Sequence, residues 1–301
     1  MFSTDSIYLS NPFLCEACYM NSAMISLFMT FKFRDTILKL TREQIAQAEG
    51  NKLSKVQSMG SQIIHLESPL EELKNLFAKL SNTKDVAIDP SMFRSSLQPR
   101  YKNSHHEEDA SEFFREYLDL IENPLQKALG KVNIKRLVDK LLTPFLQNFI
   151  DECFAGEIAN QIECNKCKKG PKKIDKILDL TVNFNPKVLD SKTQKYDLIS
   201  LIASVFETEI FEGQNKYFCD TCKELSELTT KTSKITKIPE FLIITLNRFY
   251  FDVAQNQRSK ICDPVIVPDE FDFQEIFIKN SQIRDGNHQY YLYSLIVHIV
   301  T

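Results

Sequence analysis

The chain has 301 residues, of which 43% are apolar, so it is long enough to form one large domain or two average ones around a substantial core. Its net charge of −3 gives no reason to expect a nucleic-acid partner, and its 7 glycines, without a GxGxxG or Walker pattern, argue against a phosphate-binding loop. The N-terminus lacks the features of a signal peptide, and no apolar stretch is long enough to span a bilayer. We therefore expect no membrane partner and a location in the cytoplasm, the nucleus or both.

The N-terminal half is predicted to be helical. Apolar residues recur with a 3.6-residue period from Met20 to Phe28, and the helix that they form is expected to be buried nearly all round. Ser68 and Pro69 are typical of a helix start, because Pro favours the first turn and acidic residues follow. A further strong helix is predicted from about Asp109 to Ile121.

From about residue 150 the pattern changes to β-branched and aromatic runs. These runs predict strands at Ile174–Phe184, Leu228–Ile238, Phe241–Asp252 and Tyr290–Val300, with one helix at Tyr196–Phe206. Helices first and mostly antiparallel strands later indicate an α+β architecture.

Cys18 lies at the predicted start of the first helix. A thiol there faces the positive end of the helix macrodipole, which favours the thiolate, and the free N–H groups of the same turn can stabilise an oxyanion. This arrangement suits a nucleophile in acyl transfer. Position alone leaves a buried structural thiol equally open, and Cys15 and Cys18 also form a candidate redox pair. Cys153 and Cys262 are expected to be buried as small apolar residues.

Two later CxxC pairs predict a metal site. Cys164 and Cys167 form the first pair, and Cys219 and Cys222 form the second. Each pair presents two thiolates from a tight turn, and the two turns together complete a tetrahedral four-cysteine site for a structural Zn²⁺ ion. A reducing compartment also favours metal ligands over disulfides. Two unrelated surface turns, or redox dithiols, are the alternatives.

Six segments in chain order resemble the ubiquitin-specific proteases, a papain-like family of deubiquitinating enzymes. Cys18-Tyr19-Met20-Asn21-Ser22 is similar to the Cys box of the family, and Glu108–Phe113 is similar to its Gln-x-Asp-Ala-x-Glu-Phe helix. Phe154–Cys167 resembles the entry to the zinc fingers of the family, and Tyr217–Cys222 resembles its second knuckle. Ile238–Phe249 resembles its Leu-Lys-Arg-Phe strand, and Tyr291–His298 resembles the strand before its histidine loop. No segment is decisive alone, but together they cover nearly the whole chain.

The resemblance implies a thumb–palm–fingers fold. The thumb corresponds to about 1–150, the fingers with a zinc ribbon to 151–240, and the palm strands to 241–301. It also implies a thiol-dependent deubiquitinase, which hydrolyses the isopeptide bond after the C-terminal glycine of ubiquitin and acts on ubiquitinated proteins.

The resemblance also assigns site residues. Cys18 is expected to be the nucleophile, and Asp109 and Glu112 lie where the family contacts the basic tail of ubiquitin. An acidic cluster suits that role, because it attracts arginines that approach the thiol. An ordinary acidic first turn on an amphipathic helix is the alternative.

Three departures from the family pattern leave other functions open. Phe13 stands where the family has an oxyanion-donating Asn, Cys15 replaces a Gly, and no match to the loop with the catalytic base and acid occurs before Thr301. We expect the chain to be a fragment of a longer protein. The alternatives are a catalytically impaired ubiquitin-binding protein on the same scaffold and a zinc-ribbon nucleic-acid binder, which the near-neutral charge disfavours. The weaker candidates for the base are His105, His106 and His288.

Overall fold

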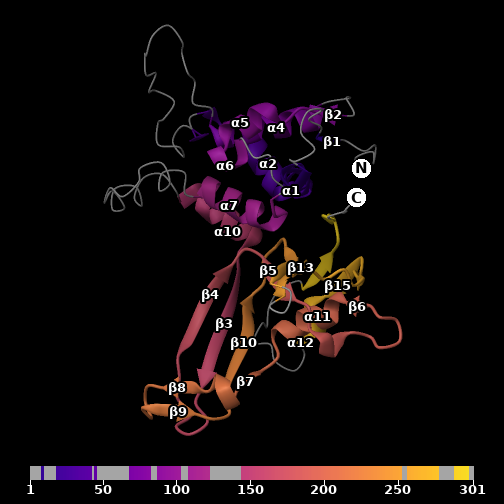
Figure 1. The fold of residues 1–301 in the computed structure, drawn as a ribbon. Coiled ribbons are helices and arrows are strands. Elements are labelled where there is room, and N and C mark those ends of the chain that lie inside the picture. Colours follow the sequence, from indigo (N-terminus) through magenta and orange to yellow (C-terminus); the bar gives the residue numbers. More distant parts are fainter. Residues whose placement is uncertain are drawn as a thin grey trace. The chain divides into compact units, whose positions relative to one another are not determined.

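The computed structural model describes residues 8–9, 18–42, 44–45, 68–82, 87–102, 108–122, 144–252, 256–277 and 288–297 (Figure 1). The chain forms two compact units. The first comprises Met1–Cys153 together with Tyr293–Thr301, and the second comprises Phe154–Leu292. The C-terminal segment therefore belongs to the same unit as the N-terminal helices. The division into thumb, fingers and palm stays a prediction.

The first unit is built mainly from helices (Figure 1). They are α1 (Cys18–Met29), α2 (Phe31–Lys39), α4 (Pro69–Asn82), α5 (Ser91–Ser96), α6 (Pro99–Lys102), α7 (Ala110–Glu122) and α10 (Pro144–Phe154), whose last residue begins the second unit. A short parallel pair joins β1 (Tyr8–Leu9) to β2 (Ala87–Ile88). Among the described residues, no helix combines the length and apolar character that crossing a membrane requires.

The predicted helix at Met20–Phe28 is confirmed as α1, which packs against α2 and α7. Its buried residues are Tyr19, Met20, Ala23, Met24 and Leu27. Cys18 and Met29 are exposed at its two ends, but every residue between them is buried or partly buried, as expected for a helix that is buried nearly all round.

The other two predicted helices of this unit are also confirmed. α4 begins at Pro69, and the Oγ atom of Ser68 accepts a hydrogen bond of 2.9 Å from the amide of Glu71, which caps the helix. α7 extends one residue beyond the predicted end at Ile121 and begins immediately after Asp109.

The second unit combines strands and helices, which confirms the α+β class for the chain. In the described part its largest sheet has the order β4-β3-β10-β7 and is antiparallel throughout, with β4 at Lys172–Ile177, β3 at Gly156–Glu163, β10 at Thr229–Lys237 and β7 at Glu209–Phe211. Figure 1 shows the antiparallel pair β8 (Tyr217–Cys219) and β9 (Glu224–Ser226) at one end of this sheet.

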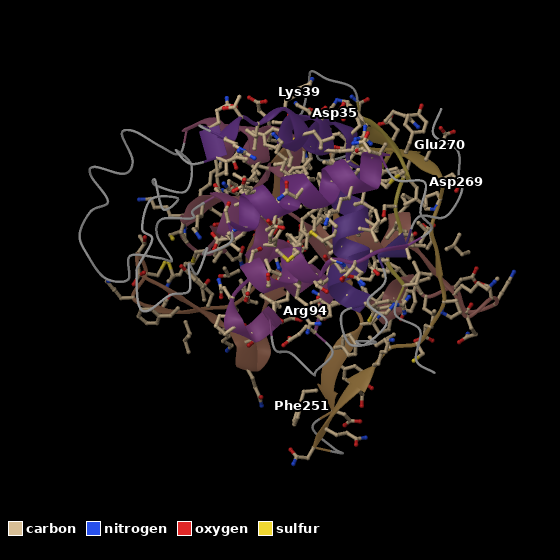
Figure 2. The ribbon with its side chains drawn as sticks, turned by 90° about the horizontal axis from the view of Figure 1, so that it is seen from above. Asp35, Lys39, Arg94, Phe251, Asp269 and Glu270 are labelled. Atoms are coloured by element: carbon tan, nitrogen blue, oxygen red, sulfur yellow. The ribbon has the colours of Figure 1, made fainter. Side chains whose placement is uncertain are left out.

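The remaining strands form two-stranded pairs. The antiparallel pairs are β12 (Phe249–Asp252) with β13 (Gln257–Lys260), and β15 (Glu270–Asp272) with β16 (Gln289–Tyr291). The parallel pairs are β5 (Leu180–Asn183) with β11 (Ile244–Asn247), and β6 (Tyr196–Asp197) with β14 (Val265–Ile266). Figure 2 labels Phe251 on β12, and Asp269 and Glu270 at the start of β15. The prediction of mostly antiparallel strands is confirmed, with these two parallel exceptions.

Three predicted strands have different boundaries in the structure. The run Phe241–Asp252 divides into β11 and β12, because the first part pairs with β5 and the second with β13. Ile174–Phe184 likewise divides into β4 and β5. The strand predicted at Tyr290–Val300 is wrong over residues 292–297, which follow the end of β16 at Tyr291 without regular structure, and its last three residues lie outside the described residues. A hydrophobic run in the sequence indicates which residues are buried. The strand boundaries depend instead on which neighbouring strand supplies the backbone hydrogen bonds.

The core of the second unit surrounds α11 (Leu198–Val205), which confirms the helix predicted at Tyr196–Phe206. Asp197 caps this helix by accepting a hydrogen bond of 2.9 Å from the amide of Ser200. Leu201 and Ile202 of the helix pack with residues from β5, β10 and α12 (Phe273–Phe277), among them Val182, Ile235 and Phe273. Short 3₁₀ turns lie at Pro186–Val188 and Gly213–Asn215.

Candidate functional site

Cys18 is the first residue of α1, and its side chain is exposed. The first N–H groups of a helix have no partner within that helix, so an exposed thiol here lies at the positive end of the helix dipole. Cys153 is buried as expected. The same expectation for Cys262 is wrong, because this residue is exposed on the segment that follows the isolated β12–β13 pair.

Five residues that the sequence singled out lie outside the described residues, namely Phe13, Cys15, His105, His106 and His298. Of the 5 histidines, the described part contains only His288. His288 is buried in the second unit, where its carbonyl oxygen accepts a hydrogen bond from the amide of Phe273.

Aromatic contacts bring the start of α1 together with the first turns of α7. The ring of Tyr19, the residue after Cys18, lies edge-on to Phe113, with ring centroids 5.6 Å apart. Tyr101 of α6 also packs on Phe113, at a centroid distance of 5.0 Å, and on Tyr19 at 6.4 Å. This cluster links the exposed thiol to the helix that carries both predicted binding residues.

Asp109 caps the N-terminus of α7. One oxygen of its carboxylate accepts hydrogen bonds from the amides of Ser111 at 2.8 Å and Glu112 at 3.0 Å, and also from the hydroxyl of Ser111. Partial burial alone would raise the pKa of Asp109, but these hydrogen bonds outweigh it, so the pKa lies below its usual value. Asp109 therefore has a structural role in α7, and its second carboxylate oxygen accepts none of these three bonds.

Sequence reasoning missed the partner of Glu112. Arg100 of α6 donates to Glu108 at 2.6 and 3.2 Å and to Glu112 and Glu116 at 3.2 Å each. The hydroxyl of Tyr101 donates to Glu116 at 2.6 Å. Glu112 and Glu116 are four residues apart and share one face of α7, and Glu108 lies just before the helix. The four-residue spacing of the three glutamates was the signal that the sequence offered.

The structure brings the four predicted metal ligands together. The Sγ atoms of Cys167 and Cys219 are 3.7 Å apart, those of Cys164 and Cys222 are 4.0 Å apart, and all four lie within 4.8 Å of one another. Four thiolates around a tetrahedral ion, with metal–sulfur bonds near 2.3 Å, would be separated by about 3.8 Å. The cluster therefore has the ligand set and the spacing to hold a metal ion.

Both cysteine pairs have the same backbone form. The amide of Lys168 donates to the carbonyl of Cys164 at 2.9 Å, and the amide of Lys223 donates to the carbonyl of Cys219 at 2.7 Å. Each lysine has a left-handed backbone, with φ of 57° at Lys168 and 58° at Lys223. The two turns are thus related copies that face one another, and Lys166 of the first forms an ion pair with Glu224 after the second.

The thiols of this cluster differ in acidity. The hydroxyl of Ser226, whose Oγ lies 3.2 Å from the Sγ of Cys164, and the amide of Cys167 lower the pKa of Cys164 to about 6. Burial raises the pKa of Cys222 to about 12, and the neighbouring thiols add to this effect. Adjacent thiolates repel one another, so a bound cation would be needed to hold all four deprotonated.

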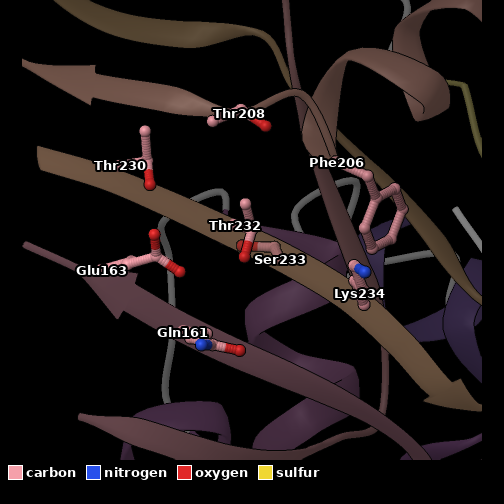
Figure 3. A pocket seen from close by; sticks show the side chains of 8 residues that line it. All are labelled: Gln161, Glu163, Phe206, Thr208, Thr230, Thr232, Ser233 and Lys234. Atoms are coloured by element: carbon pink, nitrogen blue, oxygen red, sulfur yellow. The ribbon is translucent and has the colours of Figure 1, made fainter. Parts of the chain in front are cut away.

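The second unit also contains a polar pocket of about 270 Å³ between β3, β10 and the end of α11 (Figure 3). Its lining residues are Gln161, Glu163, Phe206, Thr208, Thr230, Thr232, Ser233 and Lys234. None of these side chains is a thiol or an imidazole, so the pocket contains neither the nucleophile nor the base of a cysteine hydrolase.

Comparison with known proteins identifies the relatives of the chain. Residues 13–300 match a family model described as "Ubiquitin carboxyl-terminal hydrolase". Ubiquitin carboxyl-terminal hydrolase 48 of Gallus gallus is 25% identical over 285 residues, which are 95% of this chain and 24% of the relative. Ubiquitin carboxyl-terminal hydrolase 40 of Mus musculus is 28% identical over 282 residues, 93% of this chain and 20% of the relative.

A plant relative matches over more of its own length. Ubiquitin carboxyl-terminal hydrolase 4 of Arabidopsis thaliana is 24% identical over 304 aligned positions, which cover 94% of this chain and 75% of the relative. Against the two animal relatives, in contrast, the chain spans about a quarter of their length or less.

Proposed function

Because this chain belongs to the ubiquitin carboxyl-terminal hydrolase family, we propose that it is the catalytic domain of a thiol-dependent deubiquitinase. Its reaction is hydrolysis of the isopeptide bond between the C-terminal glycine of ubiquitin and a lysine of a modified protein. The observation that carries the proposal is the exposed thiol of Cys18 at the N-terminus of α1.

Cys18 acts as the nucleophile. Its thiolate attacks the carbonyl carbon of the glycine, and the first amide groups of α1 stabilise the oxyanion that forms. The carbon–nitrogen bond then breaks, the lysine nitrogen takes a proton from water and leaves as the amine, and the acyl group remains on the sulfur as a thioester. Water hydrolyses the thioester, which releases ubiquitin and regenerates the thiol.

Asp109 and Glu112 bind the basic tail of ubiquitin. Asp109 caps α7 and Glu112 lies in its first turn, and the ring of Tyr19 connects this helix to the start of α1. Half of the Glu112 side chain is accessible, with an exposed fraction of 47%, and Arg100 already contacts one of its oxygens. This contact supports the proposed chemistry, because it is the same guanidinium–carboxylate pairing that an incoming arginine would make.

The metal is a structural Zn²⁺ ion, held by Cys164, Cys167, Cys219 and Cys222. Four thiolates with no room for a water ligand are typical of a site that stabilises a fold and takes no part in chemistry. The helical first unit corresponds to the thumb of a thumb–palm–fingers fold, and the sheet that ends at the cysteine cluster corresponds to the fingers. The protein acts in the cytoplasm, the nucleus or both.

Reaction with a ubiquitin probe that carries a C-terminal vinyl sulfone tests the proposal. We expect the purified protein to form a covalent adduct that is lost in Cys18→Ala. Cys262→Ala is the matched control, because Cys262 is also an exposed thiol, and it should keep the adduct. Tight binding of ubiquitin without an adduct would instead support a catalytically impaired ubiquitin-binding protein.

The role of Asp109 is tested by a pair of substitutions. Asp109→Ser keeps a capping oxygen for α7 but removes the charge, whereas Asp109→Ala removes both. If the carboxylate binds a basic tail, both variants lose about 1–3 kcal/mol of affinity for ubiquitin. If the residue only caps the helix, the Ser variant binds ubiquitin as the unchanged protein does.

A further inference from the structure

The segment after β16 is attached to α1 by two pairs of hydroxyl groups. The phenol oxygen of Tyr293 lies 2.7 Å from the Oγ1 atom of Thr30, at the C-terminal end of α1. The Oγ atom of Ser294 lies 2.7 Å from the Oγ atom of Ser26. Both pairs lie within the first unit and join residues more than 260 positions apart in the sequence.

The hydroxyl groups of α1 form a regular stripe, and it leads to Cys18. Ser26 donates to the carbonyl of Ser22 at 3.0 Å, and Thr30 donates to the carbonyl of Ser26 at 3.1 Å. Since these bonds use the hydroxyl protons of Ser26 and Thr30, the hydroxyls of Tyr293 and Ser294 are the donors in the two pairs that join α1 to the C-terminal segment. Cys18, Ser22, Ser26 and Thr30 are spaced by four residues, so they share one face of the helix.

The order of the two contacts gives the direction of the segment. One step from Tyr293 to Ser294 corresponds to a step from Thr30 back to Ser26, so the segment runs antiparallel to α1 and towards the end that carries Cys18. The helix advances about 12 Å from Ser26 to Cys18 at 1.5 Å per residue. About four residues of extended chain span the same length.

We propose that Tyr293 and Ser294 are positioning residues, which use Thr30 and Ser26 to hold the C-terminal segment in register along the helix of the nucleophile. This inference rests on the proposed role of Cys18. A single hydrogen bond would let the segment rotate about that contact. The two bonds together therefore fix both its position along α1 and its direction. Thr30 is 1% exposed and Tyr293 is 43% exposed, so the bond between them is partly buried.

Kinetics of the purified protein on a fluorogenic ubiquitin substrate test the proposal. Tyr293→Phe and Thr30→Val each remove one partner of the same bond with little change in volume. We expect each to lower kcat by about 2- to 10-fold, the value of one net hydrogen bond, with little change in KM. The double variant should be no worse than either single variant, and Thr30→Ser should restore the rate.

The control is Tyr291→Phe, which removes the hydroxyl of a 66% exposed tyrosine two residues earlier. The rate of Cys18 alkylation by iodoacetamide, followed against pH, shows whether the thiol itself has changed, and unfolding in urea shows whether each variant is folded. Unchanged kcat in folded Tyr293→Phe and Thr30→Val, or an equal loss in Tyr291→Phe, would overturn the inference. Absence of any Cys18-dependent turnover in the unchanged protein would instead contradict the proposed function.

Discussion

Tyr19 and Phe113 meet edge to face, with ring centroids 5.6 Å apart and ring planes inclined at 75°. The first follows Cys18 on α1, and the second lies on the first turns of α7 after Asp109 and Glu112. The contact joins the exposed thiol and the acidic helix start through a buried aromatic cluster, and it therefore determines how far apart the two lie.

Phe113→Ala should destabilise the first unit and loosen this link. Phe113 is 1% exposed, so the substitution leaves a cavity and should cost about 3–5 kcal/mol of unfolding free energy. Urea unfolding provides the measurement. Phe218→Ala is the control, because Phe218 is 51% exposed and its removal should cost less than about 1 kcal/mol. Similar losses in the two variants would contradict the packing described for α1 and α7.

Asp109 should contribute a pH-dependent part of the stability. Its pKa in the folded chain lies below the usual value, so its contribution is complete above about pH 4 and is lost as the pH falls through the folded pKa. Asp109→Asn keeps a capping oxygen without the charge. We expect this variant to be less stable by about 0.5–1 kcal/mol near neutral pH and equal to the unchanged protein in acid. Urea unfolding across pH tests this, and a constant difference would show that the charge is not involved.

Arg100→Gln should destabilise α7 in a salt-dependent manner. The substitution leaves Glu108, just before α7, and Glu112 and Glu116 on the helix without their shared guanidinium. Because these groups are partly exposed, we expect a cost of only about 1 kcal/mol at low ionic strength, and less in high salt. Thermal unfolding at both salt concentrations measures it. Lys39→Gln makes the same change of charge on α2 and should have no comparable effect.

Removal of the metal should unfold the region around β8 and β9. Structural zinc sites contribute folding energy directly, so Cys164→Ser or Cys222→Ser should lower the bound zinc and destabilise the second unit by about 3 kcal/mol or more. Elemental analysis and unfolding with and without a chelator are the measurements. Cys262→Ser is the control, since this thiol lies outside the cluster. Unchanged zinc content in Cys164→Ser would refute the assigned ligands.

At position 223, glycine should give a more stable protein than a β-branched residue. The φ of 58° at Lys223 lies in the left-handed region, where a Cβ atom is crowded, so Lys223→Gly should be more stable than Lys223→Val by about 1–2 kcal/mol. The same two substitutions at Lys216, where φ is −63°, provide the control and should show the opposite order. Unfolding of the zinc-loaded protein measures both pairs.

Much of the candidate site was predictable because its signals are local. Helix period and the position of Cys18 identified the start of α1, and the spacing of the two CxxC pairs identified the cysteines that now lie within 4.8 Å of one another. Strand boundaries were less predictable. The break at Arg248 depends on the exchange of one partner strand for another, and no property of that run of residues records it.

The sequence alone predicted the α+β class, the helix that begins at Cys18 and the four clustered cysteines, because periodicity and short spacings are properties of neighbouring residues. It did not reveal that Arg100 contacts Glu108, Glu112 and Glu116, that Ser226 adjoins Cys164, or that Tyr293 and Ser294 lie against Thr30 and Ser26. Those contacts join residues up to 268 positions apart in the sequence. Hydrogen bonds over such separations depend on how the elements pack, and a hydroxyl or guanidinium in the sequence does not specify its partner.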